Sequence, residues 1–254
     1  SSGFAAVANG AVDISLRATT NNLWRDGNYG VDFSDSYLQT GLQVLSRSSL
    51  GLSRVEQLNG STIGVINGTT ANQVLRLALA KTGESARIIN YADSLELYDA
   101  FRKGEVDAIA RDGALLAGFQ QLLAKEESPI PTTMLAGQLS YEPIAAVVDE
   151  NQSKFLDLVN AVIATLKEAA LIGVTSANAS DKYAEATSID GSAELRKLFQ
   201  LDPGAALPEE IGLNGDRVKS ILVSVGNLNE IIDRSIFNYS QNTVSVNRQL
   251  QRPI

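Results

Sequence analysis

Residues 97–112, LYDAFRKGEVDAIARD, contain the pattern that indicates the fold class. Residues 97–102 are typical of a helix end, Gly104 can supply the left-handed conformation that closes a helix, and residues 106–110 form a short apolar run typical of a strand. Residues 4–16, FAAVANGAVDISL, repeat this order, and both copies contain Gly-x-Val-Asp in the same register. The repeat therefore predicts two related α/β lobes.

The composition narrows the class of protein. The chain has 254 residues, of which 44% are hydrophobic and 20% charged, and this is typical of a globular protein with a substantial core. Its net charge of -8 argues against a nucleic-acid partner. Because the sequence has no His and no Cys, it excludes Ser-His-Asp and Cys-His nucleophiles and His/Cys metal sites. Nothing in the sequence implies another kind of metal site or a cofactor, and we expect neither.

A glycine- and threonine-rich turn lies between the two copies of the repeat. Residues 62–66 predict a strand, residues 67–70 read Asn-Gly-Thr-Thr, and residues 71–82 predict a helix that ends at Gly83. Free backbone N–H groups and hydroxyls at a helix N-terminus favour an anion such as a carboxylate. The alternative is that Thr69 or Thr70 only caps the helix, and both roles use the same geometry.

The repeat also relates two positions beyond its strands, where open α/β sheets bind ligands. Counting from the shared aspartate, Ala18 in the turn Ala18–Thr20 corresponds to Asp112. Arg25 follows that turn and, with the Thr70 helix terminus, suits a carboxylate. Asp112, with the Thr20 hydroxyl and the Ala18 carbonyl, suits an ammonium. Together these groups predict recognition of a free α-amino acid.

Two structural alternatives remain open for the charged residues. Arg25 could form a surface ion pair, and Asp112 could cap a helix that begins near Ala114.

The motifs resemble a known family. Thr20, Arg25 and residues 31–37, VDFSDSY, resemble the "T-x-x-x-x-R … DFS-x-x-Y" signature of the periplasmic amino-acid-binding proteins of ABC uptake systems. Residues 17–25, RATTNNLWR, are similar to the general L-amino-acid-binding branch, and residues 62–70 and 104–112 are similar to second-lobe elements of the family. The resemblance runs from about residue 4 to about residue 249.

The resemblance implies an architecture. It is the two-lobe, type II periplasmic-binding-protein fold, in which each lobe is a mostly parallel sheet flanked by helices. The first lobe would comprise residues 1–45 and 142–254, and the second residues 46–141, with crossings near residues 43–47 and 139–147.

The resemblance also assigns roles in the site. Arg25 would hold the α-carboxylate, together with the backbone N–H group of Thr20 and that of Thr70. Thr70 lies in the turn that also contains Gly68. Asp112, the Thr20 hydroxyl and the Ala18 carbonyl would hold the α-ammonium. Arg17 stands where the family places a side-chain contact, which points to polar or acidic ligands, although Arg17 pairing with a surface carboxylate is equally compatible.

The implied function is that of a periplasmic solute receptor, not an enzyme, which closes on a free amino acid and delivers it to a membrane ABC permease. Two alternatives remain open. One is a same-fold cyclohexadienyl or prephenate-type dehydratase, with Glu142 or Asp112 as the acid. The other is the ligand-binding module of a sensor or receptor.

Two further expectations concern the ends of the sequence. Family members carry a strand–helix–strand segment before the part that resembles Phe4, and we expect the first lobe to be incomplete without it. A strand-completing chain or an N-terminal piece is therefore an expected partner for the strand predicted at residues 12–16. Toward the other end, residues 216–234 predict one amphipathic helix, and residues 240–254 a polar tail.

Overall fold

The computed structural model describes residues 2–16, 19–202 and 206–235. The chain divides into two compact units, residues 1–39 with 143–254 and residues 40–142. It passes between them at residues 39–40 and 142–143. The second passage lies inside the predicted crossing at residues 139–147, whereas the first comes before the predicted crossing at residues 43–47.

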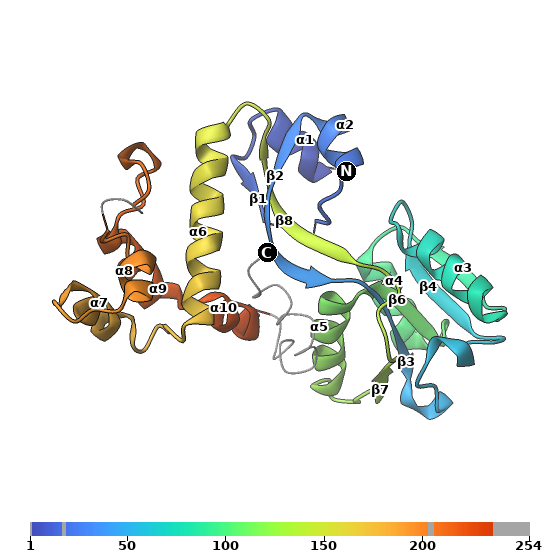
Figure 1. Ribbon diagram of the computed structural model, residues 1–254. Coiled ribbons are helices and arrows are strands. Elements are labelled where there is room, and N and C mark those ends of the chain that lie inside the picture. The colour runs from blue at the N-terminus through green and yellow to red at the C-terminus, as the bar shows by residue number, and fades with distance from the viewer. Residues whose placement is uncertain (1, 17–18, 203–205, 236–254) are drawn as a thin grey trace. The chain divides into compact units, whose positions relative to one another are not determined.

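The second unit is a five-stranded sheet covered by helices (Figure 1). Its strands lie in the order β5-β4-β6-β3-β7. Strands β5, β4 and β6 are parallel neighbours, whereas β3 pairs antiparallel with both β6 and β7. The elements are β3 (Leu42–Arg47), β4 (Thr62–Ile66), α3 (Ala71–Thr82), β5 (Arg87–Tyr91), α4 (Ser94–Lys103), β6 (Ala108–Asp112), α5 (Gly113–Ala124) and β7 (Thr132–Met134), with 3-10 turns at Ser48–Leu50 and Val55–Gln57.

Alternation along the strands places one hydrophobic core on each face of this sheet. Ala108 and Ala110 of β6 pack in the core that contains Leu75 of α3. Ile109, between them, packs in the opposite core with Phe101 of α4 and Phe119 of α5. Successive strand residues point to opposite faces, so a strand buried on both sides is apolar throughout.

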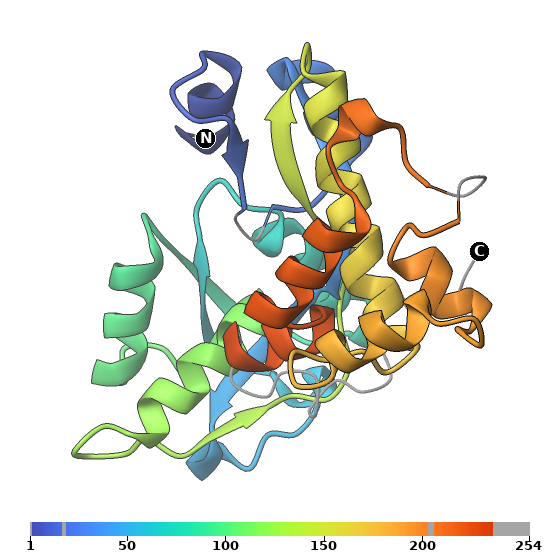
Figure 2. The same ribbon diagram turned by 90° about the vertical axis from the view of Figure 1, so that its left-hand side faces the viewer.

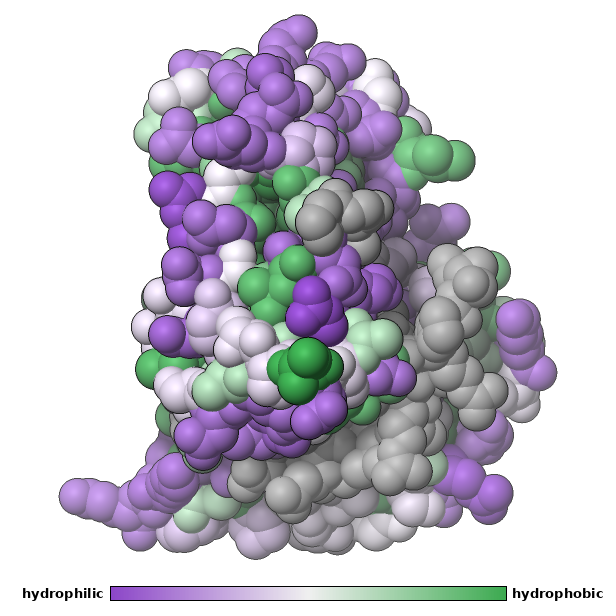
Figure 3. All heavy atoms as spheres, turned by 60° about the vertical axis from the view of Figure 1, so that its left-hand side comes forward, coloured by the Kyte–Doolittle hydropathy of each residue, from purple (hydrophilic) through white to green (hydrophobic). Residues whose placement is uncertain are grey.

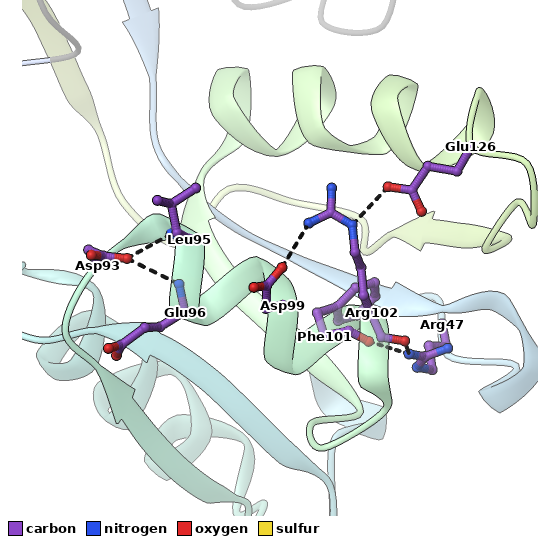
Figure 4. Close-up of polar contacts among 8 residues, drawn as sticks. All are labelled: Arg47, Asp93, Leu95, Glu96, Asp99, Phe101, Arg102 and Glu126. Carbon is purple, nitrogen blue, oxygen red and sulfur yellow. Dashed lines mark hydrogen bonds and ion pairs between the residues drawn. The ribbon is translucent and has the colours of Figure 1, made fainter.

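Helix α4 is fixed at both ends by side chains that the sequence pattern did not single out. Asp93 caps its first turn by accepting hydrogen bonds from the backbone N–H groups of Leu95 and Glu96, at 2.8 and 3.1 Å (Figure 4). Near its other end, Arg102 pairs with Glu126 at 2.8 Å. The Arg47 side chain donates to the carbonyls of Phe101 and Arg102. These contacts hold the helix that covers one core.

The first unit has a three-stranded sheet in the order β1-β8-β2, in which β1 and β8 are antiparallel. Its elements are α1 (Ser2–Ala8), β1 (Ile14–Ser15), α2 (Leu23–Tyr29), β2 (Val31–Thr40), β8 (Glu142–Asp149), α6 (Ser153–Leu171), α7 (Ala179–Thr187), α8 (Ala193–Leu198), α9 (Gly215–Val225) and α10 (Leu228–Ser235), with a 3-10 turn at Glu209–Ile211. Strands β2 and β8 reach the passages to the second unit.

Helices α6 and α10 lie side by side in the first unit (Figures 1 and 2). Between them and strands β1 and β2 lies an apolar groove of about 630 Å³. It is lined by Ile14, Leu16, Tyr37, Leu38, Phe155, Leu158, Val159, Val162, Ile163, Leu166, Leu228, Ile231 and Ile232. The groove therefore borders β1, which is an edge strand within the described part of this sheet.

The visible face in Figure 3 is dominated by hydrophilic side chains, with smaller hydrophobic areas between them. Among the described helices, none combines the length and the apolar character needed to cross a bilayer.

Three predicted elements differ from the structure. The strand predicted at residues 106–110 is β6, which begins and ends two residues further along; Asp107 precedes it, and its carboxylate accepts a hydrogen bond from the Thr62 N–H at 2.7 Å. The strand predicted at residues 12–16 is shorter in the structure, where β1 comprises only Ile14–Ser15. The helix predicted at residues 216–234 is two helices, α9 and α10, because the chain turns at Gly226 with φ 76°. The predicted tail at residues 240–254 lies outside the described residues.

Candidate functional site

Arg25 and Thr20 are brought together in the first unit. The Asn22 side chain caps α2 by accepting a hydrogen bond from the Arg25 N–H at 2.9 Å. The Arg25 Nη1 donates to the Thr20 carbonyl at 2.9 Å. Thr20 is itself bridged to Ile144 of β8. Within the described ranges no ion pair holds Arg25, so its guanidinium can offer its remaining donors to an anion.

An aromatic cluster adjoins this arginine. The Arg25 guanidinium lies 5.9 Å from the centre of the Phe4 ring, and Phe4 stacks on Tyr29 at 4.6 Å. Trp24 meets Tyr29 edge to face at 5.6 Å. Cation–π contact and stacking restrict the guanidinium to one side of α2. Sequence reasoning missed Phe4 and Tyr29, because helical and loop spacing gives no sign of their contact.

The predicted anion turn in the second unit connects β4 to α3. Gly68 has φ 71°, and its N–H donates to the Asn67 side chain at 3.0 Å. The Thr69 hydroxyl donates to the Ile66 carbonyl at 2.8 Å. Thr70 occupies the N-cap position of α3, but its side chain makes no capping hydrogen bond. The turn is exposed, and its threonines do not cap α3 through their hydroxyls.

Asp112 stands at the end of β6 and caps α5. Its carboxylate accepts hydrogen bonds from the backbone N–H groups of Ala114 and Leu115, at 3.0 and 3.3 Å. Burial raises the pKa of Asp112 to about 6; the charge of Glu142 raises it as well, while the two N–H groups and the Thr40 hydroxyl act to lower it. The capping alternative for Asp112 is thus confirmed. Its side chain is half-buried, so the carboxylate can still receive an ammonium.

The turn and Asp112 lie at the same edge of their sheet. Strands β4 and β6 are parallel neighbours, with Ile63 opposite Ala108 and Gly64 opposite Ile109. Because the carboxyl ends of parallel neighbours meet at one edge, the Gly68–Thr70 turn and Asp112 both leave the sheet there. Arg17 and Ala18, predicted to contact the ligand, lie outside the described residues.

The described side chains do not form a metal centre. Across residues 2–16, 19–202 and 206–235, no group of three or more His, Cys, Asp or Glu residues could hold an ion.

Comparison with known sequences gives a consistent set of relatives. No family model matches the sequence. A glutamate/glutamine/aspartate/asparagine-binding protein of Rhodobacter capsulatus is 28% identical over 233 residues, which cover 92% of this chain and 66% of that protein. The general L-amino acid-binding periplasmic protein of Rhizobium johnstonii is 24% identical, with the same coverage of both proteins. The chain therefore spans about two thirds of the length of these curated relatives.

Solved structures give the same result for the fold. A periplasmic binding protein of an ABC transporter from Brucella ovis, with glutathione bound, has a TM-score of 0.79 and 26% identity, covering 92% of this chain and 71% of that chain. The ligand-binding core of GluR0 in complex with L-glutamate has a TM-score of 0.53 and 21% identity, covering 65% and 70%, and shows the fold alone.

The expectation of mostly parallel sheets needs one refinement. It describes β5, β4 and β6, whereas β3, β7 and the β1–β8 pair are antiparallel. The two-lobe α/β architecture itself is that of type II periplasmic binding proteins. Sequence and fold together confirm the resemblance of this chain to the periplasmic amino-acid-binding proteins of ABC uptake systems.

Proposed function

We propose that this chain is a periplasmic solute receptor that binds a free L-amino acid and delivers it to an ABC permease. Arg25 binds the α-carboxylate, assisted by backbone N–H groups at Thr20 and in the Gly68–Thr70 turn. Asp112 binds the α-ammonium, with the Thr20 hydroxyl and the Ala18 carbonyl. Arg17 contributes to recognition of the ligand side chain.

The observation that carries this proposal is the state of the two charged anchors. Arg25 is held by the Thr20 carbonyl and the Phe4 ring, and no carboxylate pairs with it among the described residues. Asp112 is held by two backbone N–H groups and no cation is among the groups that act on its pKa. A free amino acid offers one anionic and one cationic group, which match these two anchors.

The ligand class follows from the relatives. Two of them are described as binding glutamate, glutamine, aspartate or asparagine, and L-amino acids in general. The structural relative from Brucella ovis has glutathione bound, whose γ-glutamyl group carries the same free α-ammonium and α-carboxylate. We therefore propose polar or acidic amino acids, or compounds with a free glutamyl head, as ligands.

Closure is part of the proposed mechanism. Arg25 and Asp112 belong to different compact units, and the chain passes between the units only twice. A ligand that contacts both anchors binds one arrangement of the units better than the others, and so shifts their population toward it. The permease would then distinguish loaded from empty receptor.

Native mass spectrometry of the purified chain tests the proposal. We expect the spectrum to show a complex of the chain with a retained ligand, or with glutamine, glutamate, aspartate, asparagine or glutathione when it is added. These compounds should also compete with one another for the chain. Absence of any such complex at millimolar ligand, from a chain that is folded by circular dichroism, would contradict the proposed function. Turnover of prephenate by the purified chain would instead support the dehydratase alternative.

A further inference from the structure

A chain of contacts joins Asp112 to Glu142, which is the first residue of β8 and the last residue of the second unit. Leu42, the first residue of β3, faces Asp112 in the β3–β6 ladder. The Leu42 N–H donates to the Ser140 Oγ at 2.9 Å, and the Ser140 hydroxyl donates to the Glu142 Oε1 at 2.8 Å. Ser140 therefore ties the Glu142 carboxylate to the strand that lies beside Asp112.

The backbone around this chain of contacts is closely packed. The Gly113 N–H, at the start of α5, donates to the Gly41 carbonyl at 2.9 Å, and the Leu139 N–H donates to the Leu42 carbonyl at 2.8 Å. A Cβ atom at Gly41 would lie 2.0 Å from the Ser140 carbonyl oxygen. The close approach leaves no space for a side chain at residue 41, so the segments that carry Asp112 and Glu142 cannot easily move apart.

Glu142 is the one charged side chain among the causes that shift the pKa of Asp112. Glu142 raises the pKa of Asp112, after burial, which is the larger cause. The charge of Asp112 is in turn one of the smaller causes that raise the pKa of Tyr98, after burial. The neighbouring Arg111 is engaged elsewhere, because its Nη1 donates to the Tyr98 hydroxyl at 2.6 Å. Glu142 is thus the second negative charge beside the proposed ammonium anchor.

We propose that Glu142 is a positioning residue for the ammonium end of the ligand, and that it acts through Asp112. This inference rests on the proposed function. Ser140 holds Glu142 beside Asp112, and the two negative carboxylates repel each other. A cation bound at Asp112 reduces this repulsion. In the free protein Asp112 binds a proton as the pH falls, which removes one of the two negative charges. In the complex the ligand ammonium takes the place of that proton. Ligand binding and proton binding at Asp112 therefore compete.

The competition fixes the direction of the pH dependence. Ionised Asp112 attracts the ammonium and protonated Asp112 does not, so the affinity is highest above the pKa of about 6 and falls as the pH decreases through it. One pH unit below that pKa, the expected loss is about tenfold. Removal of the Glu142 charge lowers the pKa of Asp112, and hence moves the decline in affinity to lower pH.

Calorimetric titration with L-glutamine tests this inference, because glutamine has no group that titrates between pH 5 and pH 8. We expect wild-type affinity to fall about tenfold from pH 8 to pH 5. Glu142→Gln should weaken binding at pH 8 by about three- to tenfold and shift the midpoint to lower pH. Ser140→Ala should change both in the same direction by less, and Glu142→Asp should restore part of the wild-type profile.

Glu127→Gln is the matched control, since Glu127 is exposed in the same unit and is not among the causes of the shift at Asp112. It should leave the pH midpoint unchanged. A Glu142→Gln midpoint equal to that of the wild type would overturn the inference while leaving the proposed function intact.

A second measurement keeps the inference testable without any ligand. Carbon-detected NMR of the Asp112 carboxyl group in the free protein should show a lower pKa in Glu142→Gln than in the wild type. An unchanged pKa would also overturn the inference. Failure of the wild type to bind any amino acid at pH 8, with the NMR shift present, would instead count against the proposed function alone.

Discussion

Arg25 is positioned by local contacts whose residues are close together in the sequence, apart from Phe4. The Thr20 carbonyl and the Asn22 cap fix its backbone and one donor, and the Phe4 ring covers its guanidinium. The sequence predicted Thr20 and Arg25 as partners in one site, and they are in contact. It could not predict Phe4, since nothing in the spacing of an N-terminal helix indicates which loop it will meet.

We predict that Arg25→Ala lowers amino-acid affinity by about a hundredfold, because a charge-assisted bidentate contact contributes more than a neutral one. Arg25→Lys should retain the charge but lose the forked geometry. Its amino-acid affinity should therefore lie between those of the wild type and Arg25→Ala. Isothermal calorimetry measures the effect. The control is Lys154→Ala, because Lys154 is exposed and belongs to the same unit. Unchanged affinity in a folded Arg25→Ala variant would remove Arg25 from the site.

Asp112 caps α5 and, in the proposed function, also supplies the charge that binds the ammonium. Asp112→Asn keeps a good capping side chain and removes the charge, so we expect a steep loss of affinity with no loss of thermal stability at pH 7.5. Because the folded-state pKa of Asp112 is raised, its ionisation opposes folding as the pH rises from about 4 to about 6. The wild type, but not Asp112→Asn, should show this contribution in unfolding measured against pH.

Asp112→Ala provides the comparison. It removes both the charge and the cap, so stability should fall by about 1 kcal/mol relative to Asp112→Asn. If Asp112→Asn were as unstable as Asp112→Ala but bound ligand normally, the carboxylate would be structural only.

At the scale of single elements, local patterns predicted much of the second unit. Strand β4 and helix α3 have the predicted bounds, because apolar spacing and the glycine at the helix end are properties of the local sequence. The break between α9 and α10 was not predicted. There, Glu230 accepts hydrogen bonds from Ser176, far away in the sequence, and from the Asn227 N–H, which stabilises the turn at Gly226.

The proximity of Glu142 to Asp112 was equally beyond reach of the sequence. It depends on β3 pairing with β6 and on the Ser140 hydroxyl bonding to Leu42. Pairing between distant strands follows from the whole sheet, not from the pattern of any one strand.

The cap of α4 gives a prediction at this scale. Asp93→Ala leaves two backbone N–H groups of the first turn without their side-chain acceptor, so we expect the free energy of unfolding to fall by about 1 kcal/mol. Asp93→Asn should lose much less. Urea denaturation measures both variants, and amino-acid affinity should not change in either. Equal stability of Asp93→Ala and the wild type would show that this cap contributes nothing.

At the scale of the whole molecule, the notable surface is the outer edge of β1 with the apolar groove beside it. Within the described sheet, β1 pairs with β8 alone, and Val12 and Leu16 on either side of it are 43% and 67% exposed. Unpaired strand edges next to apolar surface favour association with another strand.

We therefore predict that the chain associates with itself at high concentration. Leu16→Lys, which places a charge at this edge, should reduce the association, whereas Leu77→Lys on the exposed face of α3 should not. Light scattering across a concentration series measures the effect. If the wild type and Leu16→Lys were both monomeric at all concentrations, this edge would not be an association site.

The central claim is that the chain recognises the α-carboxylate and the α-ammonium of one ligand together. The most direct measurement is a titration of the wild-type chain, followed by NMR up to millimolar ligand, with L-glutamate and two analogues. Glutarate lacks the α-ammonium, and 4-aminobutyrate lacks the α-carboxylate. Saturable binding of glutamate, with binding of both analogues at least about a hundredfold weaker, is the predicted result. Binding of either analogue as tightly as glutamate would contradict the account.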